Sequence, residues 1–205
     1  MSSVLIEFQD VFKKYPPHYQ LSIPFLQIKK GFVYLLIGAN GTGKSTFVRL
    51  CTGSIHPTRG SITHSHGVLG VIPDAVHLPN HLTIDSYLKS LCEVRDPLHT
   101  YDDRIAAFCC EWQLNSKQKI GSLSKGMRQK VLIIQALIQY PSCYIFDEAL
   151  NGLDSSSIKN WVEWIKKLKI HKKTIIIITH DPKLFKPIAD VQLTMEEGRI
   201  SEKTL

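Results

Sequence analysis

The chain alternates between two kinds of apolar pattern. Three runs are continuous and apolar, as expected of strands buried on both faces of a sheet: FVYLLI at 32–37, CYIF at 143–146 and TIIIIT at 174–179. Segments that we expect to be helical lie between or beside these runs, at 45–51, 124–139 and 155–170. This alternation predicts an α/β fold whose sheet is mainly parallel, with right-handed crossovers between its strands.

The two ends and the middle of the chain have other patterns. VLIEF and YQLSIPFLQI near the N-terminus are expected to be extended, and VQLTMEEGRISE at 191–202 to form a hairpin with a glycine in its turn. Two segments with helical periodicity, LTIDSYLKSLCEV and TYDDRIAAFCCEW, occupy the middle. We therefore expect one domain, residues 1–205, with a core of 1–79 and 123–205 and an inserted helical subdomain of about 80–122.

Length and composition are those of an ordinary folded domain. The chain has 205 residues, of which 43% are hydrophobic and 21% charged. Its apolar runs are far shorter than the roughly 20 residues that cross a bilayer, and its first residues lack the features of a secretory signal. Five cysteines without a Cys-x-x-Cys pair indicate reduced, packed thiols in a cytosolic protein. We expect a chain that neither crosses a membrane nor leaves through one.

The formal net charge of +7 is compatible with nucleic acid, an anionic membrane surface or phosphate ligands. The charge is spread over several predicted helices, with one denser cluster at KNWVEWIKKLKIHKK that is typical of a solvated helix face. Neither interleaved aromatic residues nor a known binding motif accompanies this cluster, so we expect no nucleic-acid partner.

The loop GANGTGKST at 38–46 fits a cradle for nucleotide phosphates. Four residues match the pattern G-x-x-x-x-G-K-[ST]: Gly38, Gly43, Lys44 and Ser45. We expect the nucleotide to contact three more residues of the loop: Asn40, Gly41 and Thr46. Lys44 would bridge the β- and γ-phosphates, Ser45 would hold Mg²⁺, and Thr46 would touch the α-phosphate. The loop predicts a nucleoside triphosphate but leaves the reaction open.

Two further strands are followed by residues suited to phosphate chemistry. Asp147 comes directly after CYIF and is expected to anchor Mg²⁺ through its water shell, while Glu148 can act as general base toward an attacking water. His180 follows TIIIIT and is expected to hydrogen-bond the γ-phosphate. Because ligands bind open α/β sheets at the carboxyl ends of strands, we predict one site shared by these residues and the phosphate loop.

The segment SLSKGMRQK indicates a second anion-binding helix end. Ser124 is a good helix cap, and Gly126 in the first turn allows close approach of the backbone at a cost of up to about 1 kcal/mol against alanine. The N-terminus of a helix attracts anions. Ordinary helix capping explains Ser124 but does not explain why a glycine stands in the first turn of the helix.

Taken together, these motifs resemble those of the ATP-binding subunit of ABC transporters over nearly the whole chain. GANGTGKST is similar to Walker A, LSKGM to the signature motif, CYIFDE to Walker B and NGLD to the D-loop, and His180 resembles the switch histidine. The resemblance implies a P-loop NTPase core with a mainly parallel sheet, an antiparallel β subdomain and an inserted helical subdomain. It also implies ATP hydrolysis that powers transport.

In the family that the chain resembles, two subunits sandwich two ATP molecules head to tail. By this resemblance, Ser124 and Gly126 would contact the γ-phosphate bound by a second subunit, and Asp154 would link the two sites. Tyr15 stands where the family stacks an aromatic ring on adenine, with Tyr19 as the less favoured candidate. The expected cofactors are ATP and Mg²⁺, and the expected partner subunit is a second copy or a different ATP-binding chain.

The resemblance also implies a separate membrane-spanning permease, so we expect a cytoplasmic protein held at the inner face of the cell membrane. LSKGMRQK and NGLD look most like bacterial exporters of drugs, peptides or ions. A soluble ABC-type ATPase, such as an iron–sulfur cluster assembly factor, is the alternative. A GTPase or small-molecule kinase is disfavoured, because the chain has no Asn-Lys-x-Asp guanine reader and neither class explains LSKGM.

Several positions depart from the pattern of the family. Asp74 occupies the place of a glutamine that touches Mg²⁺ and couples to the membrane partner. A carboxylate can still bind Mg²⁺, but it repels phosphate and lacks an amide donor. Lys125 and Met127 replace glycine and glutamine in the signature, and Ala149 replaces a proline after the acidic pair. Asp74 is therefore assigned to the metal, with its effect on coupling left open.

Overall fold

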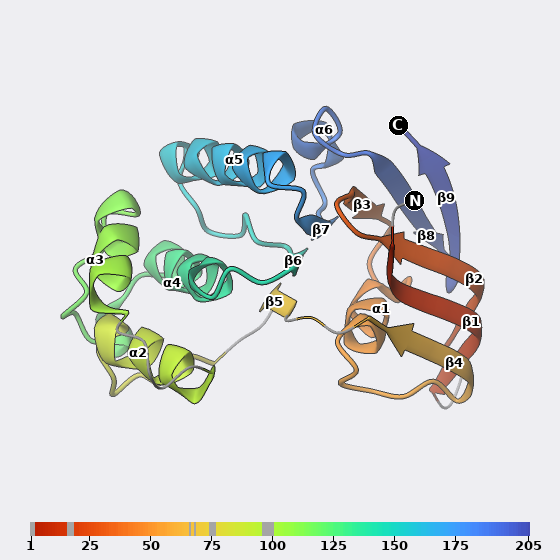
Figure 1. Cartoon of the computed structure of the whole chain (residues 1–205), viewed down its shortest axis with the longest axis horizontal. Helices are drawn as coiled ribbons and strands as arrows, with labels where there is room; N and C mark the ends of the chain where they lie inside the picture. Colours follow the sequence, from red (N-terminus) through yellow and green to blue (C-terminus); the bar gives the residue numbers. More distant parts are fainter. Residues whose placement is uncertain (1–2, 16–18, 66, 68, 74–76, 96–100) are drawn as a thin grey trace.

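The computed structural model describes residues 3–15, 19–65, 67, 69–73, 77–95 and 101–205. Nine strands in this part of the chain form one sheet with helices on both of its faces (Figure 1). The strands are β1 (Val4–Tyr15), β2 (Tyr19–Lys29), β3 (Val33–Ile37), β4 (Arg59–His64), β5 (Leu69–Ile72), β6 (Cys143–Asp147), β7 (Thr174–Ile178), β8 (Val191–Glu196) and β9 (Arg199–Thr204). The helices are α1 (Lys44–Cys51), α2 (Ile84–Arg95), α3 (Asp102–Glu111), the 3-10 helix η1 (Ile120–Ser122), α4 (Lys125–Ile138), α5 (Ser155–Ile170) and α6 (Pro182–Phe185).

One half of the sheet is parallel. The strands lie in the spatial order β4-β1-β2-β9-β8-β3-β7-β6-β5, and β5, β6, β7, β3 and β8 run parallel to one another. The registers pair Leu36 with Ile178, and Asp147 with the same Ile178, so the carboxyl ends of β3, β7 and β6 lie at one edge. The predicted α/β fold with a mainly parallel sheet is confirmed.

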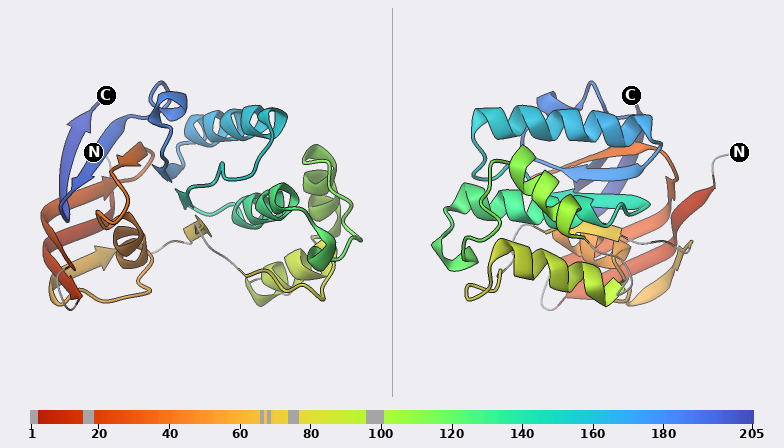
Figure 2. Two further views of the ribbon diagram at one scale, coloured as in Figure 1. Left: turned by 180° about the vertical axis from the view of Figure 1, so that it is seen from behind. Right: turned by 60° about the vertical axis from the view of Figure 1, so that its left-hand side comes forward.

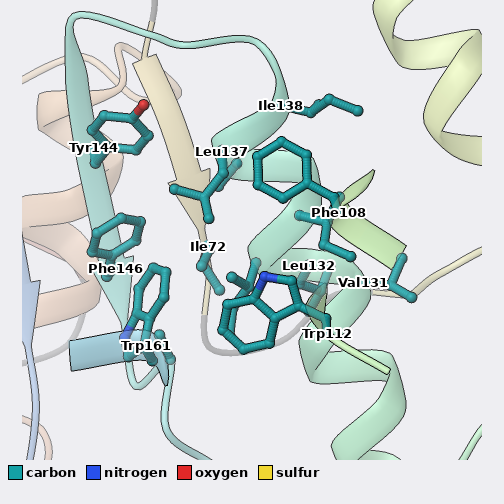
Figure 3. Close-up of a cluster of buried hydrophobic side chains, with 14 of the residues drawn as sticks. Ile72, Phe108, Trp112, Val131, Leu132, Leu137, Ile138, Tyr144, Phe146 and Trp161 are labelled. Atoms are coloured by element: carbon teal, nitrogen blue, oxygen red, sulfur yellow. The ribbon is translucent and has the colours of Figure 1, made fainter. Parts of the chain in front are cut away.

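The central strands are buried on both faces, and alternate residues belong to two different apolar clusters. In β6, Tyr144 and Phe146 join a helix-side cluster with apolar residues of α2, α3, α4 and α5. Cys143 and Ile145 join a strand-side cluster with apolar residues of α1, β1 and β2. Figure 3 shows part of the helix-side cluster, in which the ring of Trp161 meets Phe146 edge to face at a centroid distance of 4.6 Å. The continuous apolar runs of the sequence follow from burial on both faces.

The other half of the sheet is mainly antiparallel, with one short parallel pairing between β2 and β9. β1 pairs with β2 and with β4, and β8 pairs with β9. The turn between β8 and β9 contains Glu197 and Gly198, whose φ angles of 46° and 74° are typical of a two-residue hairpin. The predicted hairpin is therefore present, and the two extended N-terminal segments form the predicted strands β1 and β2.

Helices α2 and α3 lie at the end of the molecule farthest from β1, β2 and β4 (Figure 2). They are joined to α4 by apolar packing and by hydrogen bonds such as that from Gln139 Nε2 to the carbonyl oxygen of Leu91 at 3.1 Å. The helices expected in the middle of the chain are thus present, while the division into core and subdomain stays a prediction. No helix among the described residues is long and apolar enough to span a membrane.

Helix α5 starts at a capping carboxylate. Asp154 accepts hydrogen bonds from the hydroxyl of Ser156 at 2.6 Å and from the backbone N–H and hydroxyl of Ser157 at 2.8 and 3.0 Å. The ammonium of Lys130 lies 3.5 Å from the same carboxylate. These hydrogen bonds, that of Ser156 foremost, hold the pKa of Asp154 well below its ordinary value, with Lys130 adding a smaller effect.

We predict that Trp161→Ala destabilises the protein by about 3–5 kcal/mol, because it removes a fully buried indole that packs against the rings of Phe146 and Trp112. The measurement is urea unfolding followed by circular dichroism. Val94→Ala is the matched control, since Val94 is 89% exposed and its replacement should change the free energy of unfolding by less than about 0.5 kcal/mol. Equal effects of the two substitutions would contradict the assignment of the core.

We predict a pH-dependent effect of Asp154→Asn on stability. Because the pKa of Asp154 is lowered in the folded state, its charge stabilises the protein above the ordinary value of 3.8, and this contribution is lost as the pH falls below that value. The difference in melting temperature between the original protein and Asp154→Asn should therefore be largest near neutral pH and shrink in acid. A difference that stays constant with pH would show that the charge contributes nothing.

Candidate functional site

The carboxyl ends of β3, β6 and β7 border a pocket of about 280 Å³. Nine residues line it, and the sequence analysis singled out every one: Asn40, Gly41, Gly43, Lys44, Ser45, Thr46, Asp147, Glu148 and His180. The phosphate loop follows β3, the acidic pair ends β6, and the histidine follows β7. The parallel order of these three strands therefore brings together segments that lie far apart in the sequence.

The phosphate loop ends at the N-terminus of α1. Gly43 precedes the helix with φ of 113°, a conformation that favours glycine, and it has no side chain with which to cap the first turn. The N–H groups of that turn are therefore available to an anion, which the helix dipole also favours. An uncapped helix N-terminus that follows a glycine-rich loop is typical of phosphate-binding sites.

Lys44 is bound to the loop that it follows. Its ammonium donates hydrogen bonds to the carbonyl oxygens of Gly38 at 2.8 Å and Ala39 at 2.9 Å, and the residue is only 8% exposed. A buried ammonium requires such partners. These bonds hold the cation against the loop, at the wall of the pocket.

The acidic pair also lines the pocket. Asp147 is buried at the end of β6, and the side chain of Glu148 is 11% exposed. Glu148 has φ of 52°, which is uncommon for a residue other than glycine, and its N–H donates to the carbonyl oxygen of Ile178 at 3.1 Å. His180 Nε2 lies 3.3 Å from Glu148 Oε1. A carboxylate and an imidazole can thus act on the same reacting atom.

Other predicted site residues lie outside the lining of this pocket. Gly38 lines a neighbouring pocket of about 930 Å³ beside β8 and β9, and Tyr15 ends β1 with the ammonium of Lys13 5.4 Å from its ring centre. Three more are found on or beside α4 and α5: Ser124, Gly126 and Asp154. Asp74 lies outside the described residues.

Ser124 caps α4 as predicted, accepting a hydrogen bond from the N–H of Met127 at 3.3 Å. The structure explains why position 126 is a glycine, which the sequence alone did not reveal. A Cβ atom built on it would lie 2.5 Å from the carbonyl oxygen of Gly152, so only glycine allows α4 to approach this loop. The first turn of α4 is thus packed directly against the NGLD segment.

Sequence reasoning missed two polar residues on the same helix. Gln129 Nε2 donates a hydrogen bond to the carbonyl oxygen of Ala149 at 3.0 Å, and Lys130 pairs with Asp154. The available signal was their spacing, because positions three and four residues after Gly126 lie on the same helix face. This face carries the contacts between α4 and the loop that follows β6.

Comparison with known proteins identifies the family. The ABC transporter family model matches residues 22–151. The zinc import ATP-binding protein ZnuC of Rickettsia bellii is 33% identical over 88% of this chain and 78% of its own length. The Nod factor export ATP-binding protein I of Burkholderia orbicola is 28% identical over 97% of this chain and 70% of its own length.

Solved structures of related proteins have the same fold. The structure of an ATP-binding subunit of an ABC transporter has a TM-score of 0.88 at 26% identity, covering 98% of this chain and 90% of that one. A dimeric ATP-binding cassette in a post-hydrolysis state, bound to ADP and Pi, has a TM-score of 0.86 at 21% identity, covering 98% and 99%. The second likeness concerns the fold alone.

The family model covers more than half of the chain, and the Walker and signature motifs lie on the elements that the fold requires. The chain therefore belongs to the ABC transporter family, as an ATP-binding and ATP-hydrolysing subunit.

Proposed function

We propose that the chain hydrolyses ATP in order to move a solute across a membrane through a separate membrane-spanning permease. The observation that carries this proposal is the convergence of Lys44, Asp147, Glu148 and His180 on one pocket. The two relatives named above belong, by name, to an import system and an export system. They support transport as the use of the ATP.

The pocket also suits Mg²⁺ bound together with ATP. The hydroxyl of Ser45 and the carboxylate of Asp147 line the pocket, and such oxygen donors are those that Mg²⁺ prefers. When bound, the ion neutralises charge on the phosphates. We assign Ser45 and Asp147 to Mg²⁺ on this donor set, and Asp74 on the sequence alone.

In the proposed mechanism, Lys44 binds the β- and γ-phosphates while the N–H groups of the loop surround them. Glu148 accepts a proton from the water that attacks the γ-phosphorus, as its general base. His180 lies close enough to Glu148 to orient the carboxylate, and it would also hydrogen-bond the γ-phosphate. Tyr15 supplies the ring on which adenine stacks.

We further propose that two ATP-binding subunits, identical or different, close around two ATP molecules. Ser124 and Gly126 stand at the N-terminus of a helix that does not line the pocket, so an anion bound there belongs to a second subunit. Asp154, beside this helix end, would link the two sites. The dimeric solved structure with the same fold supports this arrangement.

The permease partner places the chain at the inner face of the cell membrane. For the direction of transport we propose export, because LSKGMRQK and NGLD resemble the corresponding segments of exporters. The relative at 33% identity is an import subunit by name, so the composition of the purified complex is used below to test the direction.

We predict that Glu148→Gln keeps ATP binding but lowers ATP turnover by about 100-fold or more, because the general base is lost while the shape of the side chain is kept. Without turnover, the ATP-bound dimer should accumulate. Phosphate release measures the turnover, and analytical ultracentrifugation with ATP measures the dimer. Turnover at the original rate would remove Glu148 from the mechanism.

Lys44→Ala is the matched control for this experiment. This substitution removes the charged hydrogen bonds that Lys44 would donate to the phosphates. It should therefore weaken ATP binding by about tenfold or more, and no ATP-bound dimer should accumulate. An unchanged ATP affinity would show that the phosphate loop is not the binding site.

We predict that affinity purification of the tagged chain from detergent-solubilised membranes recovers a membrane-spanning protein. The amount of this membrane-spanning protein that stays bound to the tagged chain should be compared between the original chain and Glu148→Gln. Recovery of soluble partners only would favour the alternative, a soluble ABC-type ATPase. A partner complex that includes an external solute-binding protein would favour import over export.

A further inference from the structure

The loop that follows the proposed general base is attached to α4 at three points. The carbonyl oxygen of Ala149 accepts the hydrogen bond from Gln129, the backbone of Gly152 lies against Gly126, and Asp154 pairs with Lys130. Gly126, Gln129 and Lys130 all lie in the first two turns of the helix. The loop and the helix end therefore form one packed unit.

Glu148 is held in an uncommon backbone conformation by contacts on both of its sides. Its N–H is bonded to Ile178 of β7, and its own carbonyl oxygen accepts a hydrogen bond from the N–H of Asn151 at 3.1 Å. The next carbonyl group, that of Ala149, is held by the amide of Gln129. A φ of 52° in a glutamate persists only where the surrounding structure determines it.

We propose that Gln129 is a positioning residue for ATP hydrolysis. By holding the carbonyl of Ala149, its amide fixes the backbone of Glu148 and thereby the direction of the carboxylate toward the pocket and His180. The inference rests on the proposed role of Glu148 as general base. It also connects the signature helix with the base of the same chain, because Gln129 lies on the helix that Ser124 caps.

The alternative role for Gln129 is purely structural, and the chain offers a control for it. Gln139, at the other end of α4, is also partly buried and also donates its amide to a carbonyl oxygen, that of Leu91. This bond lies away from the pocket. Replacement of either glutamine by leucine removes the same type of hydrogen bond, but only Gln129 is adjacent to the segment of Glu148.

The test is steady-state ATP hydrolysis by the full chain carrying Gln129→Leu or Gln139→Leu. Loss of the hydrogen bond at Gln129 should lower kcat about tenfold while KM for ATP changes by less than about twofold. Gln129→Glu, which keeps the shape but replaces the donor by an acceptor, should lower kcat at least as much. Gln139→Leu should keep kcat, and thermal unfolding compares the stability of the variants.

A double variant distinguishes the possible outcomes. In a Glu148→Gln background, Gln129→Leu should cause no further loss of turnover, since it acts through the missing carboxylate. Two results would overturn the inference while Glu148→Gln stays inactive. One is an unchanged kcat in Gln129→Leu, and the other is an equal loss of kcat in Gln129→Leu and Gln139→Leu. Normal turnover in Glu148→Gln would instead overturn the proposed function, and the inference with it.

Discussion

The structure depends on one constraint, the burial of three adjacent parallel strands on both of their faces. β3, β7 and β6 pair side by side, and nearly all of their residues are buried. Their backbone groups must therefore be paired within the sheet, and the charged side chains of the site lie only where the strands end. Because parallel strands end at the same edge, the phosphate loop, the acidic pair and His180 meet there. The pocket follows from the topology of the sheet.

The position of α4 separates the signature segment from the pocket of its own chain. Helix α1 packs on the strand side of the sheet, whereas α4 packs on the helix side, and the lining of the pocket includes no residue of the signature segment. The proposed second subunit would complete each pocket. Within one chain, the contacts between α4 and the loop after Glu148 connect the part proposed to face a partner with the part proposed to perform the chemistry.

Much of this arrangement could be predicted from the sequence, because its signals are local. A phosphate loop between a strand and a helix, and carboxylates at the end of an apolar run, carry their meaning in consecutive residues. The contact between Gln129 and Ala149 joins residues 20 positions apart and depends on how α4 packs, so no short pattern shows it. The same holds for Gly126, whose close neighbour Gly152 was visible only in three dimensions. Asp74 lies outside the described residues and keeps only its sequence-based assignment.

The two apolar clusters have a consequence for how such a subunit can change. Both clusters include residues of the same strands, but each side chain belongs to one cluster, since alternate residues point to opposite faces of the sheet. A change of volume between α2 and α3 therefore meets the helix-side faces of the strands, whereas Phe47 and Val48 of α1 belong to the cluster on the opposite faces. The outer helices α2 and α3 can therefore vary with little effect on α1, whereas α4 cannot, since it also holds the loop after Glu148.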